Sequence, residues 1–350
     1  MVIDKAKTVR TGEELDLLQL LPWVNKTLPG LHGTPEVTQY SGGASNWTYR
    51  LKFKNDDLIL RRPPKGKKAK GAHNMVREYN LQKAIKPSFG FVPEMKALCE
   101  DVSVLGADFY LMERVEGIIP RKNLPKDLRL SEKDVSKLCT NFLDVLIQLH
   151  RVDYKGSNLG HLGTGSGFVE RQLVGWFKRY EDSRTWNVNR GKRIMKWLEK
   201  NKPSHEKLCL THNDFRFDNV VLNPSSPTEI IGVLDWELAT IGDPLMDLGN
   251  SLAYWIEEAD DRLAKSTRRQ PTTIKGMMTR KEVIAYYCNA MGVAERDFGF
   301  YEVFGLFRLS VIAQQIYRRF FDRETKNPEY KQFWILVNYL HYRCMRRIRA

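Results

Sequence analysis

One stretch of the chain carries oxygen-bearing side chains at a spacing that suits phosphoryl transfer. His212-Asn213-Asp214 is followed after four further residues by Asn219, and a second acid, Asp235, comes after two short apolar runs. Kinases use an Asp-x-x-x-x-Asn loop, in which the carboxylate accepts the proton of the attacking hydroxyl. The amide of that loop and a second carboxylate hold Mg²⁺. We therefore predict that Asp214 is the catalytic carboxylate and that Asn219 and Asp235 are the metal ligands, with His212 orienting the loop through hydrogen bonds.

The residues between these groups must bring them together. The apolar runs 220–222 and 230–234 flank the sequence Asn-Pro-Ser-Ser-Pro, which is typical of a turn. This pattern predicts a hairpin that holds Asp214, Asn219 and Asp235 near one another. The alternative is that these side chains only form turns, because Asp and Asn often bond to nearby backbone. Three such residues at kinase spacing favour the catalytic interpretation.

The stretch also resembles a known family. The residues that carry the resemblance are His212-Asn213-Asp214-Phe215-Arg216-Phe217-Asp218-Asn219, Leu234-Asp235-Trp236-Glu237, and Gly242-Asp243-Pro244 with Asp247. They are similar to the aminoglycoside phosphotransferase and choline kinase-like superfamily. They look closest to the branch that supplies the kinase-like domain of some acyl-CoA dehydrogenase fusion proteins. Most of that superfamily has Gly after the His, and Asn213 departs from the pattern at a position that affects loop conformation more than chemistry.

The first third of the chain reads as a small sheet. Gly43, Ser45 and Asn46 lie between two strand-like runs, and glycines there allow a backbone to approach phosphates closely. A Gly-Gly pair alone is more often an ordinary hairpin turn, but the resemblance implies a nucleotide loop. The run 58–62 reads as a third strand and offers Arg61, which the resemblance makes the cation for the α- and β-phosphates. Glu78, on a helix running from Asn74 to about residue 85, is then its ion-pair partner.

Further local expectations concern helix and strand ends. Apolar residues at helical spacing predict a first helix within 13–28, with a break at Pro22. The runs 96–99 and 109–112 predict two more strands joined by a hairpin at 101–106. Asp243-Pro244 is a good helix start, which makes Asp243 structural, and His150 ends a core helix as a structural group.

The resemblance implies an α+β, protein-kinase-like fold of two lobes. The expected boundary divides a small antiparallel-sheet lobe, residues 1–114, from a larger, mainly helical lobe, residues 115–350, with a hinge at about 112–117. In relatives the hinge backbone holds the adenine, which assigns the carbonyl of Glu113 and the N–H of Val115 to nucleotide binding. Backbone contacts leave no side-chain signature, so the sequence does not separate ATP from GTP.

Composition limits the other possibilities. The formal net charge is +14, with basic residues scattered and without an RNA-binding signature, so nucleic-acid binding is a weak alternative. No run approaches the length of a membrane span, and the first residues lack the apolar core of a signal peptide. The five cysteines show no zinc spacing, which favours reduced thiols in a cytoplasm.

These observations predict an ATP- and Mg²⁺-dependent phosphotransferase that acts on a hydroxyl group of a small molecule. An acidic cluster at 257–261 could suit a polycationic aminoglycoside, but basic residues follow it at once. The basic excess favours an anionic or neutral acceptor, such as a hydroxyacyl thioester. The alternative is a catalytically inert kinase-like module that binds a nucleotide or a protein partner; Arg61 and Asn213 favour it, and the joint presence of Asp214, Asn219 and Asp235 argues against it.

Overall fold

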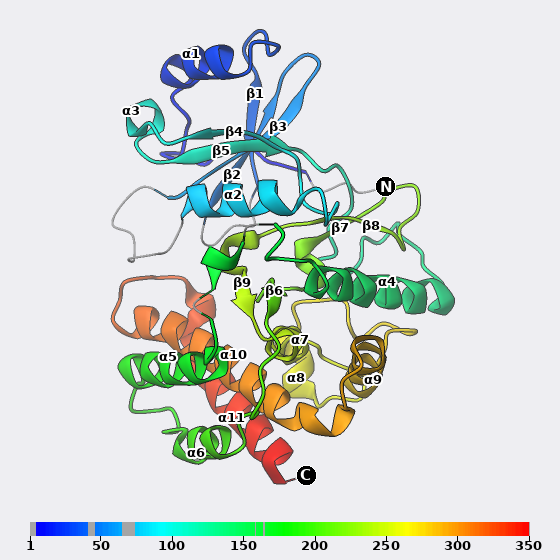
Figure 1. The fold of residues 1–350 in the computed structure, drawn as a ribbon. Coiled ribbons are helices and arrows are strands. Elements are labelled where there is room, and N and C mark those ends of the chain that lie inside the picture. The colour runs from blue at the N-terminus through cyan, green and yellow to red at the C-terminus, as the bar shows by residue number, and fades with distance from the viewer. Residues whose placement is uncertain (1–4, 41–45, 65–73, 158, 164, 350) are drawn as a thin grey trace. The chain divides into compact units, whose positions relative to one another are not determined.

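The computed structural model describes residues 5–40, 46–64, 74–157, 159–163 and 165–349, without the side chains of residues 296 and 297. The described residues form two compact units. The first contains residues up to 119, 125–128 and 219–237, and the second contains 120–124, 129–218 and 238 onward. Figure 1 shows strands gathered in the first unit and helices dominating the second. The predicted α+β class is confirmed. The lobe boundary at 114 and the hinge at 112–117 stay predictions.

The first unit is built on an antiparallel sheet, five-stranded in its described part, with the order β1-β2-β3-β5-β4. The strands are β1 (Glu36–Gln39), β2 (Trp47–Lys52), β3 (Asp57–Arg62), β4 (Met95–Cys99) and β5 (Phe109–Glu113). Alternation along the strands divides their apolar side chains between two cores. Leu58 and Leu60 of β3 pack with the residues of α1 (Leu17–Thr27), whereas Ile59 packs with those of α2 (Met75–Ile85).

One local prediction in this unit is wrong, and a second is right for the strand pairing but not for the turn. Helix α1 continues through Pro22. The proline has no N–H to donate to the carbonyl of Leu18, but Leu18 is exposed, so water can bond to that carbonyl instead. The segment that joins β4 to β5 forms a short helix, α3 (Val102–Leu105), in place of a simple turn, while the two strands pair antiparallel as the predicted hairpin requires. Asp101 caps it by accepting from the N–H of Ser103, and Gly106 ends it in the left-handed conformation. The turn-forming residues Asp101 and Gly106 therefore cap the two ends of one helical turn.

A second hairpin completes the first unit. It joins β7 (Val220–Leu222) to β8 (Ile230–Val233), as the sequence predicted. Leu222 also bonds to Ile118, so the segment after β5 pairs with β7. A Cβ on Gly232 of β8 would lie 3.0 Å from Cγ1 of Val115, which explains why this strand position has no side chain.

The second unit is mainly helical and surrounds the long helix α10 (Gly299–Phe321). Its other helices and strands are α4 (Glu132–His150), α5 (Phe168–Ser183), α6 (Lys192–Lys200), β6 (Cys209–Thr211), β9 (Thr240–Gly242), α7 (Pro244–Ala253), α8 (Arg262–Thr267), α9 (Arg280–Met291) and α11 (Phe333–Arg349). Helices α7 and α10 cross closely at Gly249 and Gly305. A Cβ on Gly305 would lie 2.1 Å from the carbonyl oxygen of Gly249, so this crossing needs a glycine. Asp243 caps α7 through its carboxylate, as predicted.

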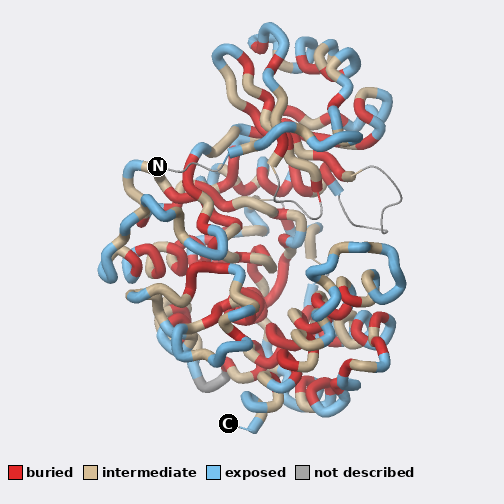
Figure 2. The backbone as a smooth tube through the Cα atoms, turned by 180° about the vertical axis from the view of Figure 1, so that it is seen from behind, coloured by how far each residue is buried: buried red, intermediate tan, exposed pale blue. Residues whose placement is uncertain are grey.

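Burial follows the helices and strands closely. Figure 2 shows buried residues in both the sheet and the helical unit, with exposed residues at turns and along the helices. All five cysteines are buried and free of disulfides. Within the described ranges, no helix combines the length and the apolar character needed to cross a bilayer.

Candidate active site

The β7–β8 hairpin places Asn219 and Asp235 side by side in the first unit. The carbonyl of Asn219 accepts a hydrogen bond of 2.8 Å from the N–H of Leu234, the residue before Asp235. Asn219 ends a 3₁₀ turn (Phe217–Asn219) and is 8% exposed, and the Asp235 side chain is 36% exposed. The sequence thus brings an amide and a carboxylate to one end of a rigid hairpin.

Asp235 has a left-handed backbone, with φ of 66°. Non-glycine residues rarely adopt this conformation, although Asp and Asn tolerate it better than most. The neighbouring Trp236 holds it in place, because the buried indole donates to the carbonyl of Val233 at 2.8 Å and packs edge-on against Phe89. Strained residues that packing holds in this way concentrate at functional sites.

Arg61 supplies a cation next to Asp235. Its guanidinium donates to the Asp235 carboxylate at 2.8 Å and lies 3.2 Å from a carboxylate oxygen of Glu78, so the predicted ion pair with Glu78 is confirmed. Tyr110 donates to the same Glu78 oxygen at 2.9 Å. Burial raises the pKa of Glu78, against the effect of Arg61. Burial alone would lower the pKa of Arg61, but Glu78 and Asp235 outweigh it and raise that pKa well above its ordinary value.

The predicted nucleotide loop is described only at its end. Gly43 and Ser45 lie outside the described residues. Asn46 is buried, and its amide donates to the carboxylate of Glu237 at 3.0 Å. Arg77 of α2 donates to the Glu237 carbonyl at 3.4 Å. Glu237 therefore anchors the end of the loop, a role that its position two residues after Asp235 did not reveal.

The predicted adenine-binding backbone lies where β5 ends. Glu113 is the last residue of β5; its own N–H donates to the carbonyl of Glu94 at 2.8 Å, and its side chain is exposed. Val115 packs against Gly232 of β8. Binding of a nucleotide by the Glu113 carbonyl and the Val115 N–H stays a prediction.

In the second unit, one buried carboxylate accepts hydrogen bonds from the backbone of the loop that carries Asp214. Asp247 of α7 is fully buried and accepts from the backbone N–H of His212 at 2.6 Å and of Asn213 at 2.8 Å. Nδ1 of the buried His212 accepts from the N–H of Asp214 at 3.3 Å. Asp247 therefore braces the loop, and His212 is placed to orient Asp214 through a hydrogen bond.

Asn213 shows how the chain tolerates its departure from the family pattern. Its φ is 64°, the left-handed region that glycine adopts without strain. Its side-chain amide donates to Oγ1 of Thr211 at 3.0 Å and to the carbonyl of Leu238 at 3.1 Å. Asn is among the residues best able to adopt this conformation, so the loop keeps a glycine-like backbone without a glycine.

Basic and aromatic side chains surround Asp214, and sequence reasoning missed them. Arg216 lies 3.1 Å from the Asp214 carboxylate, and its guanidinium is 4.6 Å from the ring centroid of Tyr254. Arg308 of α10 donates to the carbonyl of Asn213 at 3.0 Å and lies 5.2 Å from the ring of Trp176. No local pattern marks Arg308, because helix packing alone brings it to the loop.

A buried histidine supports Asp247 from behind. His150, at the end of α4, lies 3.1 Å from Asp247 through Nε2 and 2.5 Å from the Tyr287 hydroxyl through Nδ1. Burial would raise the pKa of Asp247, but the hydrogen bond from His150 and the nearby charges outweigh it and lower that pKa. The expectation that His150 is a structural group agrees with these contacts.

Asn219 and Asp235 fit a magnesium ion in type and number. Mg²⁺ prefers hard oxygen ligands and is usually held by one or two carboxylates together with phosphates and water. Within the described residues there is no group of three or more His, Cys, Asp or Glu that could hold a metal on its own. One amide and one carboxylate would leave the other positions around such an ion to phosphates and water.

The comparisons with known proteins identify the class. Residues 36–280 match the phosphotransferase enzyme family, and the chain belongs to this family. It is homologous to the kinase-like region of acyl-CoA dehydrogenase family members 10 and 11. It is 35% identical to mouse acyl-CoA dehydrogenase family member 10 over 84% of its own length, but it spans only 28% of that protein.

Solved structures agree with the fold. A "putative aminoglycoside phosphotransferase" from Ralstonia eutropha matches with a TM-score of 0.80 and 26% identity, over 95% of this chain and 98% of that one. Aminoglycoside phosphotransferase APH(4)-Ia, in a ternary complex with AMP-PNP and hygromycin B, matches with a TM-score of 0.59 and 13% identity over 95% and 98%. The predicted kinase-like fold is thereby confirmed.

Proposed function

We propose that this phosphotransferase moves the γ-phosphoryl group of ATP to a hydroxyl group of a small molecule in a Mg²⁺-dependent reaction. The observation that carries the proposal is the junction of Asn219, Asp235 and Arg61, where a hairpin hydrogen bond and an ion pair hold two oxygen ligands beside a cation. Arg61 would contact the α- and β-phosphates, and Asn219 and Asp235 would hold Mg²⁺. The metal supplies neutralisation of phosphate charge when bound.

Asp214 would accept the proton of the acceptor hydroxyl as this oxygen attacks phosphorus. Only four residues separate it from Asn219 in the chain. The bond from its N–H to His212 and the two bonds from the loop to Asp247 fix its backbone. Such positioning supplies most of the rate in phosphoryl transfer, where the transition state is loose.

The surroundings of Asp214 favour an anionic or neutral acceptor over an aminoglycoside. Arg216 and Arg308 lie beside the catalytic loop. The guanidinium of Arg179 lies 4.6 Å from the ring centroid of Trp176, which Arg308 also contacts. The acidic cluster at 257–261 is largely engaged in local ion pairs, since Arg280 pairs with Glu257 and Asp260 and Lys265 pairs with Glu258. A polycation would meet arginines here, whereas a hydroxyacyl thioester of coenzyme A carries, in its coenzyme part, phosphates that arginine binds well. The name of the mouse relative, an acyl-CoA dehydrogenase family member, is compatible with such an acceptor.

The test compares binding with turnover. We expect Asp235→Asn, which keeps the left-handed backbone accessible, to weaken Mg·ATP binding in calorimetric titrations. Asp214→Asn is expected to leave this binding nearly intact while ATP consumption with a hydroxyacyl thioester falls roughly 10²–10⁴-fold, the usual contribution of a general base. Near-normal turnover by Asp214→Asn would remove its assigned role.

The same assay decides between the proposal and an inert module. A panel of hydroxyacyl thioesters, neutral alcohols and aminoglycosides is offered to the wild-type protein with and without Mg²⁺. An inert module would bind Mg·ATP and consume none with any acceptor. Preferential turnover of an aminoglycoside would overturn the acceptor class while leaving phosphoryl transfer in place.

A further inference from the structure

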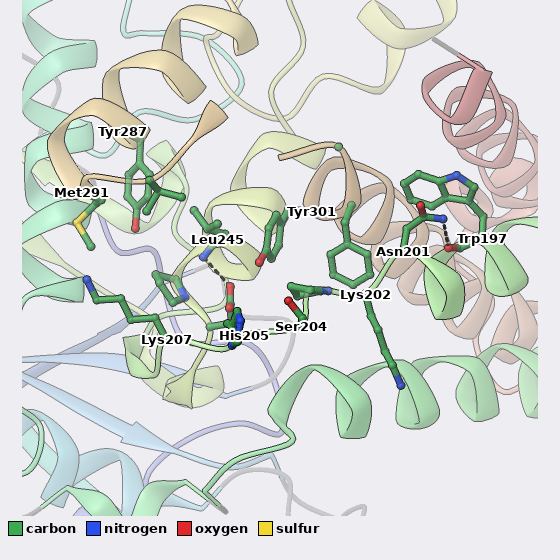
Figure 3. A pocket seen from close by; sticks show the side chains of 16 residues that line it. Trp197, Asn201, Lys202, Ser204, His205, Lys207, Leu245, Tyr287, Met291 and Tyr301 are labelled. Atoms are coloured by element: carbon green, nitrogen blue, oxygen red, sulfur yellow. Dashed lines mark hydrogen bonds between the residues drawn. The ribbon is translucent and has the colours of Figure 1, made fainter. Parts of the chain in front are cut away.

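A pocket of about 630 Å³ opens in the helical unit, and none of the described residues assigned to phosphoryl transfer lines it. Figure 3 shows side chains from α6, from the segment before β6, and from the start of α7 directed around it. Its walls are mostly apolar and aromatic, with Trp197, Leu245, Met291 and Phe300 among them. The volume lies within the range of small-molecule sites. Asp214, Arg216 and Arg308 are not among its lining residues.

The charged side chains around the pocket differ in whether they already have partners in the protein. Lys202 forms an ion pair with Glu170 of α5 and extends away from the pocket in Figure 3. Oδ1 of Asp243 accepts from the backbone N–H groups of Leu245 and Met246, at 2.9 and 3.0 Å. Lys207 has no ion-pair partner within the part of the chain that the structure describes, and its side chain lies along the wall below Met291.

This arrangement selects for a single negative charge. The ammonium group of Lys207 attracts an anion, whereas the buried Asp243 carboxylate, which also lines the pocket, repels one, so the pair favours a ligand with no more than one negative charge, held at Lys207. Burial raises the pKa of Asp243 to about 6, so it is charged near neutral pH. A carboxylate attached to an apolar ring system satisfies both the lining and the charge.

The pocket also touches the support of the catalytic loop. Tyr287 lines it and is bonded through its hydroxyl to His150 at 2.5 Å. His150 contacts Asp247 at 3.1 Å, and Asp247 holds the N–H groups of His212 and Asn213. Every member of this chain of contacts belongs to the helical unit.

We propose that this pocket is a second ligand site for a small aromatic or alicyclic monocarboxylate. Its occupancy steadies the catalytic loop through Tyr287, His150 and Asp247. Lys207 binds the carboxylate, and the apolar walls bind the ring. The site is independent of the proposed phosphotransfer, since neither binding nor the loop measurement requires ATP.

The binding test uses three probes of one shape and different charge: 2-naphthoate, neutral 2-naphthamide and cationic 2-naphthylmethylamine. Calorimetry on the full chain should show 2-naphthoate binding about tenfold more tightly than the amide, the effect of one charge-assisted hydrogen bond. Lys207→Gln should remove that preference, and Lys202→Gln, the matched control, should retain it. Val293→Trp, which fills the pocket, should abolish binding. Preference for the amine would assign recognition to Asp243 and overturn the proposal, as would binding that survives Val293→Trp.

The coupling test follows amide hydrogen exchange in the loop. Saturating 2-naphthoate should slow exchange at His212 and Asn213 by several-fold in the wild-type protein. In Tyr287→Phe, which keeps the ring in the pocket wall but loses the hydroxyl, 2-naphthoate should still bind while the slowing disappears. Unchanged exchange in the wild type, or equal slowing in Tyr287→Phe, would overturn the coupling.

Discussion

At the scale of single residues, the site depends on two non-glycine positions with left-handed backbones, Asn213 and Asp235. Both follow short strands and both begin stretches that carry chemistry. Asn and Asp are the residues that accept this conformation at the lowest cost after glycine. The choice of side chain at these positions is therefore constrained by conformation as well as by hydrogen bonding.

Substitutions at Asn213 separate these two constraints. Asn213→Ala loses both side-chain hydrogen bonds and adds left-handed strain, whereas Asn213→Gly loses the bonds without the strain. We expect the alanine variant to be the less stable of the two by about 1 kcal/mol, the cost of the left-handed region for a residue with a Cβ. Urea unfolding of both variants measures the difference. Equal stabilities would show that the φ of 64° is not retained in solution.

The Arg61–Glu78 pair is the second residue-scale test. Because Glu78 is 2% exposed, removing Arg61 leaves a buried charge with less compensation. Arg61→Gln and Glu78→Gln should therefore each weaken Mg·ATP binding, and the double variant should weaken it by less than the sum. We expect a coupling of about 1 kcal/mol or more in a double-mutant cycle. Additive effects would mean that Glu78 does not steer Arg61.

At the scale of helices and strands, the packing of α11 on α10 depends on a neutral histidine. His341 is 3% exposed, lies 3.2 Å from the Ser310 hydroxyl and packs 5.1 Å from the Tyr180 ring. Burial lowers its pKa from 6.5 to about 4. His341 binds a proton more readily in the unfolded chain than in the folded one, so the stability gained by keeping His341 neutral is complete above pH 6.5. It is lost as pH falls from 6.5 toward 4.

The shift corresponds to about 3 kcal/mol over that window. His341→Phe removes the titration while keeping a ring, so its free energy of unfolding should fall less steeply with acid than that of the wild type. Urea unfolding at a series of pH values between 7.5 and 4.5 measures both slopes, and all other titrating groups are shared by the two proteins. Parallel curves would contradict a buried, neutral His341.

Local signals in the sequence account for much of the fold. These signals are the alternation in β2, the apolar run in β3, the turn between β7 and β8, and the Asp-Pro start of α7, and each depends on residues close in the chain. Prediction failed where two local structures suit the same residues. Asp101 and Gly106 serve a simple turn or a helical turn equally well, and an exposed carbonyl lets α1 pass Pro22.

The candidate site was predictable only in part, for a related reason. Asp214, Asn219 and Asp235 stand out because their spacing lies within one stretch. Arg308 and Tyr287 come from helices far along the chain, and only packing brings them to the catalytic loop and to its support. Glu237 was visible in the sequence, but its bond to Asn46 joins residues 191 positions apart.

At the scale of the whole molecule, the chain divides into two units whose boundary falls inside the catalytic stretch. Asp214 belongs to the helical unit, and Asn219 and Asp235 belong to the unit that contains the sheet. Of the formal charge of +14, the residues of the helical unit carry +13 and those of the unit that contains the sheet carry +1, and many of the arginines are already paired with acids. This distribution makes the net charge a poor guide to the site, where the arrangement of a few arginines decides the local field.

The burial of every thiol turns the cysteines into reporters of local opening. Burial raises the pKa of Cys99, Cys139, Cys209 and Cys344, in the case of Cys139 to about 12, so little reactive thiolate exists in the closed protein. Cys99 belongs to the sheet unit and the other four to the helical unit. Alkylation followed by mass spectrometry should therefore measure the rate at which each unit opens. We expect Cys99 to be alkylated at a different rate from the other four cysteines. Five coincident time courses would show that the whole chain opens as one cooperative body.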